Sequence, residues 1–144
     1  MGGVRAEIIV PGLPDEDIGP ASAVVLTEPI SFWGGVCPAR GVLTDPRSRH
    51  RHRSISGAAL FIRELRGSSS ASSVLLELIY RRRAPAAIIL DSPDAILALG
   101  VIVAREMGWP SPPLLRLSAL EQERIADGAS VAISRDGQLR VHGG

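Results

Sequence analysis

The chain of 144 residues has a net charge of +1, with 45% hydrophobic and 22% charged residues, as expected of one globular domain over residues 1–144. A balanced charge and 3% aromatic residues argue against nucleic-acid binding, and no apolar run approaches the roughly 20 residues that cross a bilayer. The single cysteine, Cys37, excludes an internal disulfide and a metal site built from thiols of this chain alone, and the start of the sequence does not resemble a secretion signal, so a soluble, cytoplasmic protein is expected.

The first half of the chain is predicted to be rich in β structure. Short apolar runs over residues 6–10, 23–26, 41–44 and 55–62 are separated by proline, glycine and polar residues, as strands are. The stretch 30–38 places Phe and Trp beside a Gly-Gly pair, which suits either an aromatic plug of the core or a wall for a ligand or partner.

Residues 47–53 form a run of alternating basic residues, RSRHRHR. No aromatic residues are interleaved with the arginines, so a solvated or subunit-facing loop is expected rather than a nucleic-acid site. The two histidines His50 and His52 lack nearby carboxylate or thiolate ligands in the sequence, which argues against a metal site.

Residues 65–75, LRGSSSASSVL, form the first candidate site. Small residues let backbone N–H groups approach a ligand closely, and the helix start that follows adds unpaired donors and a positive partial charge. An anion, or a developing oxyanion, is favoured in such a place. A structural cap or linker is the alternative interpretation of the same residues. Because the loop follows a predicted strand, it lies where ligands gather in α/β sheets.

The second half of the chain alternates helices and strands. A helix of about three turns is predicted from Ser73, with arginines 81–83 in its last turn. A second, largely buried helix is expected to be capped by Ser92. The remaining predicted elements are a buried strand over 86–90, a strand over 113–117, a short helix from Ser118 to near Gly128, and a hairpin around Asp136-Gly137. The fold class is therefore α/β with a partly parallel sheet and a β-rich N-terminal half.

Four motifs in this order resemble a known family, the small subunit or swivel domain of aconitase X. The motifs lie at residues 28–36 (EPISFWGGV), 66–75 (RGSSSASSVL), 84–89 (APAAII) and 96–100 (ILALG). The resemblance implies a swivelling β/β/α domain that docks on a large catalytic subunit, and the large subunit would hold an iron–sulfur cluster or iron. Such pairs are hydro-lyases, and this chain alone would be inactive.

The resemblance also implies roles for individual residues. Ser68, the first serine after Gly67, would be the general base that takes a proton from the carbon next to a carboxylate, while iron accepts the departing hydroxyl. The neighbouring loop residues would bind the hydroxy-carboxylate substrate or hold the loop: Arg66, Gly67, Ser69, Ser70 and Ser72. No metal ligand is expected in this chain.

Three alternatives stay open at this point. The preferred substrate is cis-3-hydroxy-L-proline, and phosphomevalonate is the other substrate that the resemblance suggests. A swivel-type module that binds an anion or a partner without catalysis would use the same loop. Two features of the sequence depart from the family pattern. Relatives commonly have an acidic residue in place of Cys37, and the run 47–53 only approximates a His-Pro-containing segment.

Overall fold

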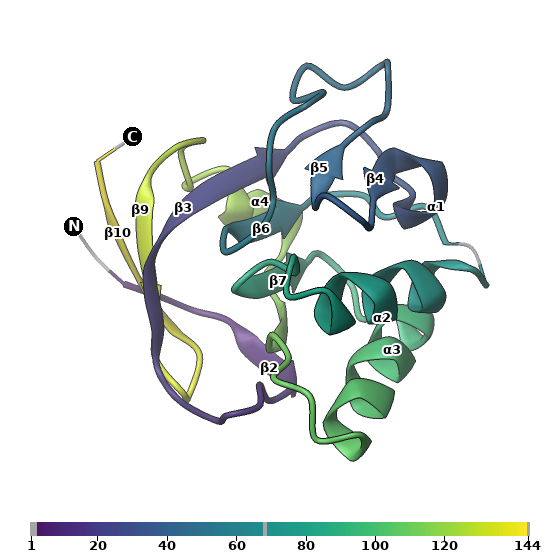
Figure 1. The fold of residues 1–144 in the computed structure, drawn as a ribbon. Coiled ribbons are helices and arrows are strands. Elements are labelled where there is room, and N and C mark those ends of the chain that lie inside the picture. The colour runs from purple at the N-terminus through teal and green to yellow at the C-terminus, as the bar shows by residue number, and fades with distance from the viewer. Residues whose placement is uncertain (1–2, 68, 144) are drawn as a thin grey trace.

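A curled sheet of eight strands organises the chain, seen in a computed structural model that describes residues 3–67 and 69–143 (Figure 1). The strand order is β1-β10-β9-β3-β6-β7-β8-β2. The strands are β1 (Val4–Arg5), β2 (Glu7–Val10), β3 (Ile18–Leu26), β6 (Ala59–Ile62), β7 (Ala87–Leu90), β8 (Leu114–Arg116), β9 (Ser130–Ile133) and β10 (Gln138–His142). Because β1 and β2 flank the single residue Ala6, the two edges of the sheet come together and the sheet is nearly a barrel.

Strand β3 joins the parallel and antiparallel parts of the sheet. Residues 23–26 of β3 pair in parallel with β6, which pairs in parallel with β7, and β7 with β8. The earlier part of β3 pairs antiparallel with β9, and β9 with β10 in the hairpin that Asp136-Gly137 predicts. The predicted parallel units and hairpin are confirmed.

Helices α2 (Ala71–Tyr80) and α3 (Ala95–Glu106) pack together over one face of the parallel strands (Figure 1). Alternate residues of β6 point to opposite faces of the sheet and pack in two different cores. Leu60 and Ile62 pack in the core that includes α2 and α3, whereas Ala59 and Phe61 pack in a second core with the hairpin strands. The apolar run of β7 is buried at every position, as predicted.

A small lobe lies between β3 and β6 in the sequence. It contains the short helix α1 (Phe32–Gly35) and the two-stranded pair β4 (Val36–Cys37) and β5 (Val42–Leu43). Phe32 is fully buried, which confirms an aromatic plug, but Trp33 is 65% exposed and does not belong to it. Helix α1 interrupts its helical geometry at Trp33 and at Gly34, whose φ of +84° suits glycine.

Several predicted helix boundaries are wrong. Helix α2 ends at Tyr80, so arginines 81–83 follow it instead of forming its last turn, and Arg81 Nε pairs with Glu77 at 2.7 Å. Helix α3 is capped by Asp94 rather than Ser92, because the Asp94 carboxylate accepts the N–H of Leu97. The short helix α4 (Ala119–Gln122) is capped by Ser118 as expected but ends well before Gly128.

Helix α3 is less buried than its sequence predicts. Leu99 and Ile102 are 54% and 45% exposed, although the helix is apolar over most of its length. Among the helices of residues 3–67 and 69–143, none is long and apolar enough to cross a membrane.

Candidate functional site

The candidate site lies where the parallel strands β3, β6 and β7 end. Open α/β sheets bind ligands at this edge, because the loops that follow the strands meet there and helices begin there. The loop after β6 leads to α2, and the loop after β7 leads to α3. The Gly-Ser loop predicted from the sequence is the first of these two connections.

The entry to the Gly-Ser loop is fixed by the segment that follows β3. The backbone N–H of Arg66 donates to the carbonyl of Ile30 at 2.8 Å, and the N–H of Ile30 donates to the carbonyl of Glu64 at 3.1 Å. Two of the sequence motifs, 28–36 and 66–75, are therefore hydrogen-bonded to each other. Arg66 and Gly67 are exposed at the point where this pairing ends.

Ser68, the predicted catalytic residue, lies outside the described residues. The residues around it are described: Ser69 is exposed, Ser70 precedes α2, and Ser72 lies in the first turn of the helix. The Ser72 hydroxyl is 3.4 Å from the carbonyl oxygen of Ser69 and donates to it. Ser72 thus helps to hold the loop, which is one of the two roles expected for it.

Gly67 borders the start of α3. A Cβ atom placed on Gly67 would lie 4.0 Å from Oδ2 of Asp94, an ordinary van der Waals contact. The other oxygen of Asp94 accepts the N–H of Leu97 at 2.9 Å. Packing in this structure therefore does not require glycine at position 67, and the missing side chain leaves the backbone accessible to a ligand.

The charge of Arg66 reaches the neighbouring lobe. Hydrogen bonds from the backbone and the guanidinium of Arg47 lower the pKa of Asp45, and the positive charge of Arg66 lowers it further. Arg47 Nε lies 3.3 Å from Asp45 Oδ1, so Arg47 is the closer partner. Arg66 remains exposed beside the loop, where its charge is available to an anion.

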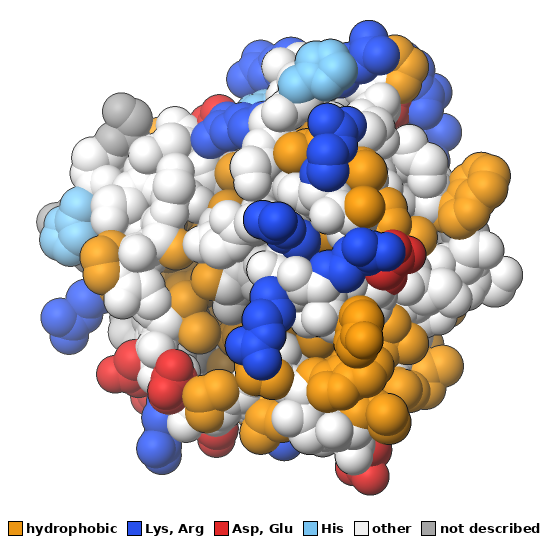
Figure 2. All heavy atoms as spheres, viewed as in Figure 1, with side chains coloured by type: hydrophobic (Ala, Val, Ile, Leu, Met, Phe, Trp, Pro, Cys, Tyr) orange, Lys and Arg blue, Asp and Glu red, His pale blue; other side chains and the backbone are white. Residues whose placement is uncertain are grey.

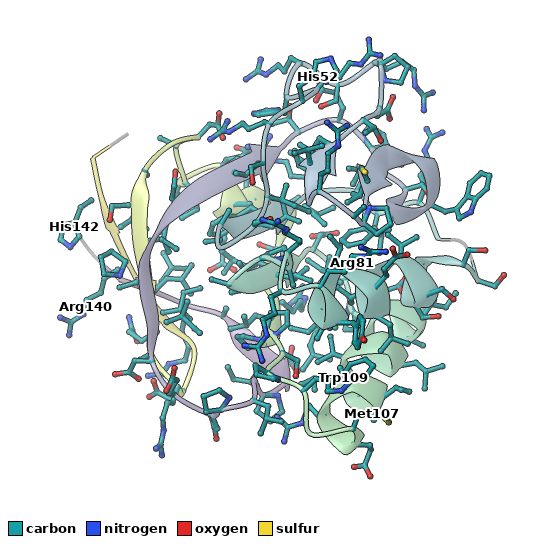
Figure 3. The ribbon with its side chains drawn as sticks, viewed as in Figure 1. His52, Arg81, Met107, Trp109, Arg140 and His142 are labelled. Carbon is teal, nitrogen blue, oxygen red and sulfur yellow. The ribbon has the colours of Figure 1, made fainter. Side chains whose placement is uncertain are left out.

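The basic run 47–53 is attached to the domain by Asp127. Arg53 Nη1 donates to Asp127 Oδ2 at 2.6 Å, and Nε2 of the buried His50 lies 3.1 Å from the same oxygen. The other Asp127 oxygen accepts the backbone N–H of Val25 at 2.9 Å. His52 lies in the exposed part of this loop (Figure 3). His50 is therefore a structural residue that fixes the loop to β3.

The pKa of Asp127 reflects this attachment. Burial by itself would raise the pKa, but the hydrogen bonds from Val25, Arg53 and His50 together outweigh it and hold the pKa below its usual value. The carboxylate is thus kept ionised as the anchor of the loop.

Sequence reasoning missed two charged residues at the strand ends. Glu28 follows β3 and Arg63 follows β6, and buried atoms of both, Glu28 Oε1 and Arg63 Nε, have no hydrogen-bond partner among the described residues. Buried polar atoms are nearly always paired, so these two atoms indicate a missing partner. Arg63 directly follows β6 and Glu28 lies two residues after β3, so their position near the ends of parallel strands was the available signal for the residues, though not for their missing partners. Asp94 was missed because Ser92 and Pro93 matched a helix start equally well.

The described part of the site offers small polar groups and one cation. No group of three or more His, Cys, Asp or Glu residues that could hold a metal exists in the described part of the chain. A hollow of about 990 Å³ lies instead beside β1 and β10, lined by residues such as Val4, Arg124 and Arg140, and includes none of the described residues of the Gly-Ser loop. The arrangement can present a hydroxyl, backbone donors and one arginine to an anion.

Comparison with known proteins identifies the family. The family model for the aconitase X swivel domain matches residues 12–141. A cis-3-hydroxy-L-proline dehydratase of Pseudomonas aeruginosa is 44% identical over 128 residues, which are 86% of this chain and 21% of that protein. The phosphomevalonate dehydratase small subunit of Thermococcus kodakarensis is 34% identical over 116 residues, 80% of this chain and 87% of that protein.

The fold agrees with the same family. The crystal structure of Thermococcus kodakaraensis aconitase X in its holo-form superposes with a TM-score of 0.82 at 26% identity, over 99% of this chain and all of that chain. The chain spans only about a fifth of the length of the Pseudomonas dehydratase. From the motifs, the curled sheet and these matches together, the chain belongs to the aconitase X swivel-domain family.

Proposed function

We propose that this chain is the small subunit of a two-part dehydratase that removes water from a small hydroxy-carboxylate, with cis-3-hydroxy-L-proline as the substrate. The observation that carries the proposal is the exposure of Gly67 and Ser69, the two neighbours of Ser68, between the end of β6 and the start of α2. The choice of substrate is supported by the relatives: the cis-3-hydroxy-L-proline dehydratase of Pseudomonas aeruginosa is 44% identical, against 34% for the phosphomevalonate dehydratase small subunit of Thermococcus kodakarensis.

In this proposal, Ser68 acts as its alkoxide, which takes the proton from the carbon next to the substrate carboxylate and becomes a hydroxyl. The C–H electron pair then forms the C–C double bond as the substrate hydroxyl departs with its bonding pair. A serine hydroxyl is a very weak acid, and a helix N-terminus stabilises a nearby negative charge by about 0.3–1 kcal/mol, which lowers a pKa by less than about one unit. Helix α2 alone therefore cannot activate Ser68. The remaining stabilisation must come from nearby positive charge and from exclusion of water when a second polypeptide covers the site.

Arg66 is the residue that we assign to the substrate carboxylate. Its side chain is exposed beside Gly67, and its backbone is held by Ile30, so the cation is anchored at the edge of the loop. Arginine suits this role because its planar guanidinium can form two parallel hydrogen bonds to a carboxylate. Backbone donors at the start of α2 and the hydroxyl of Ser69 would complete the anion site.

The unpaired atoms of Glu28 and Arg63 fit an incomplete site. A donor and an acceptor left buried without partners cost stability, about 1–3 kcal/mol each, unless the assembled enzyme pairs them. We assign their partners to the substrate or to the large subunit. The iron centre is likewise assigned to the large subunit, since the described residues of this chain offer no ligand cluster for it.

Phosphomevalonate dehydration is the second candidate. Its support is the relation to several phosphomevalonate dehydratase small subunits, including the 34% identical protein of Thermococcus kodakarensis. A phosphorylated substrate carries more negative charge than a proline derivative and would need more cations than Arg66 at the loop. The two substrates are therefore separated by direct assay.

The test is reconstitution with the aconitase X large subunit of the same genome. Dehydration of cis-3-hydroxy-L-proline and of phosphomevalonate is measured for the wild-type pair, for each chain alone, and for pairs carrying Ser68→Ala or Ser73→Ala. The exposed Ser73 of α2 is the matched control. We expect turnover of the proline derivative by the wild-type and Ser73→Ala pairs only. Full activity of the Ser68→Ala pair would reject Ser68 as the general base.

A further inference from the structure

Helix α3 has a sequence that is apolar on every side. Its residues 95–104 read AILALGVIVA, and charge appears only at Arg105 and Glu106. An amphipathic helix on a protein surface has a polar outer face, whereas a helix that is hydrophobic all round is normally buried all round. The sequence of α3 therefore predicts cover on two opposite sides.

The described domain covers only one of these sides. Leu97, Gly100, Val101 and Ala104 are buried where α3 packs on α2 and the sheet. The opposite face is exposed and consists of Leu99, Ile102 and Val103, followed by Met107. Figure 2 shows apolar side chains gathered over the end of α2 and over α3, and Figure 3 places Met107 at the end of α3.

The spacing of the exposed residues makes them one surface. Positions 99, 102 and 103 are separated by three and four residues, so their side chains share a helix face. The exposed fractions are 54% for Leu99, 45% for Ile102, 36% for Val103 and 59% for Met107. Contiguous apolar surface of this kind marks a site of protein–protein contact.

The exposed face of α3 continues from the candidate active site. The cap of α3, Asp94, is next to Gly67, and Gly100 touches Ser72 of α2, with a Cβ at position 100 reaching 3.2 Å from the Ser72 carbonyl oxygen. Leu99 is adjacent in sequence to this contact. A polypeptide that covers the Gly-Ser loop would extend about 20 Å along α3, at 1.5 Å per residue, to cover the apolar face from Leu99 to Met107.

We propose that the exposed face of α3, Leu99, Ile102, Val103 and Met107, is a docking surface for the large subunit. This inference rests on the proposed function, which requires a second polypeptide over the Gly-Ser loop. It is also supported by the Pseudomonas dehydratase, of which the match to this chain covers 21%, because the rest of that protein is a large body available to pack against this domain. A second copy of this chain is the competing occupant, and nothing in the described residues ties such a copy to the Gly-Ser loop.

The proposal is tested by binding of the full chain to the large subunit of the same genome. Leu99→Glu and Ile102→Glu place a charge in the centre of the proposed surface, and Leu120→Glu is the matched control. Leu120 is 74% exposed and lies in α4, a different helix from the one that carries the proposed surface. Circular dichroism and thermal unfolding verify that each variant is folded.

We expect Leu99→Glu and Ile102→Glu each to raise the Kd for the large subunit by about tenfold or more, and Leu120→Glu to leave it within about twofold. In the wild-type chain, amide hydrogen exchange over residues 95–107 should slow when the large subunit is added. Unchanged exchange there, or equal Kd values for all three variants, would overturn the proposal.

Sedimentation measures whether the free chain forms a homodimer. If it does, and if Ile102→Glu dissociates the homodimer but leaves binding to the large subunit intact, the exposed face of α3 contacts a second copy and the proposal is overturned. Ser68→Ala separates this inference from the proposed function, since it should lower kcat by about 10²–10⁴-fold while leaving the Kd unchanged. Loss of binding on Leu99→Glu together with full activity of Ser68→Ala would retain the docking surface and reject the catalytic role.

Discussion

Gly100 of α3 lies against Ser72 of α2 so closely that a Cβ atom on Gly100 would be 3.2 Å from the Ser72 carbonyl oxygen and 3.4 Å from its Cα. The obstacle is backbone in the first turn of α2, which cannot move independently of the helix. The contact thus sets the distance between the two helices at the end that carries the Gly-Ser loop. Glycine at this position is a requirement of packing, unlike glycine at position 67.

Gly100→Val should separate the two helices. Overpacking of this kind lowers the free energy of unfolding by about 1–3 kcal/mol. This loss exceeds the stability that a helix gains when a residue with higher helix propensity replaces glycine. Urea denaturation of the isolated chain measures the change. Ala95→Val, at an exposed position in the first turn of the same helix, is the control and should change stability by less than about 1 kcal/mol. Equal stability of Gly100→Val and wild type would contradict the close contact.

Asp127 should make the stability of the domain depend on acid pH. The folded pKa of this carboxyl is lowered, so its contribution is fully present above the unfolded pKa of about 3.9 and is lost as pH falls through the folded pKa. Asp127→Asn should reduce stability at pH 7 by about 1–3 kcal/mol, because the charged hydrogen bonds to Arg53 and His50 are lost. It should also flatten the decline of stability between neutral pH and pH 3.

The control for Asp127 is the exposed Asp15, whose change to Asn should leave both the stability at pH 7 and its pH profile close to those of wild type. Chemical unfolding at several pH values gives both quantities. A steep acid decline that persists in Asp127→Asn would show that another group causes it.

Asp94 should stabilise α3 by capping its N-terminus, through the hydrogen bond from Leu97 to the Asp94 carboxylate. Asp94→Ala removes the acceptor for the N–H of Leu97 and should cost about 0.5–2 kcal/mol, whereas Asp94→Asn keeps an acceptor and should cost much less. Ser92→Ala is the comparison that the sequence prediction suggests, and it should have little effect. Thermal unfolding of the three variants decides between the caps, and a larger loss for Ser92→Ala than for Asp94→Ala would reverse the assignment.

Cys37 should form a thiolate more readily than an ordinary cysteine. A hydrogen bond from the Arg40 side chain, with smaller help from backbone N–H groups of Arg40 and Ala39, lowers the pKa of the thiol. The pH dependence of iodoacetamide alkylation gives the pKa, and Arg40→Ala should raise it and slow alkylation at pH 7.5. Arg49→Ala, a change in a different loop, should have no effect; an equal slowing by both variants would exclude a specific role of Arg40.

The strands and the Gly-Ser loop could be predicted because their signals are local. The continuous apolar run of β7 and the turn residues Asp136-Gly137 each specify one element without help from distant residues. The place of the loop after β6 followed from the order of strands and helices. Strand β3 was predicted only over its last four residues, because Ile18–Ser22 are extended through pairing with the distant strand β9.

The contacts between distant residues could not be predicted from local patterns. The attachment of the 47–53 loop depends on Asp127, a residue 77 positions away from His50, and no spacing rule connects them. The open face of α3 was missed for a different reason, since apolar composition indicates burial but does not say whether the covering surface belongs to the same chain. The unpaired atoms of Glu28 and Arg63 likewise become visible only when the three-dimensional contacts are known.

The catalytic role of Ser68 is decided by the turnover of cis-3-hydroxy-L-proline by the reconstituted pair with Ser68→Ala in this chain. We expect kcat to fall by about 10²–10⁴-fold, as for loss of a general base, while the Kd between the two subunits stays unchanged. Ser73→Ala in the same preparation should keep wild-type turnover. A Ser68→Ala pair that dehydrates the substrate at the wild-type rate would contradict the assignment of Ser68 as the base.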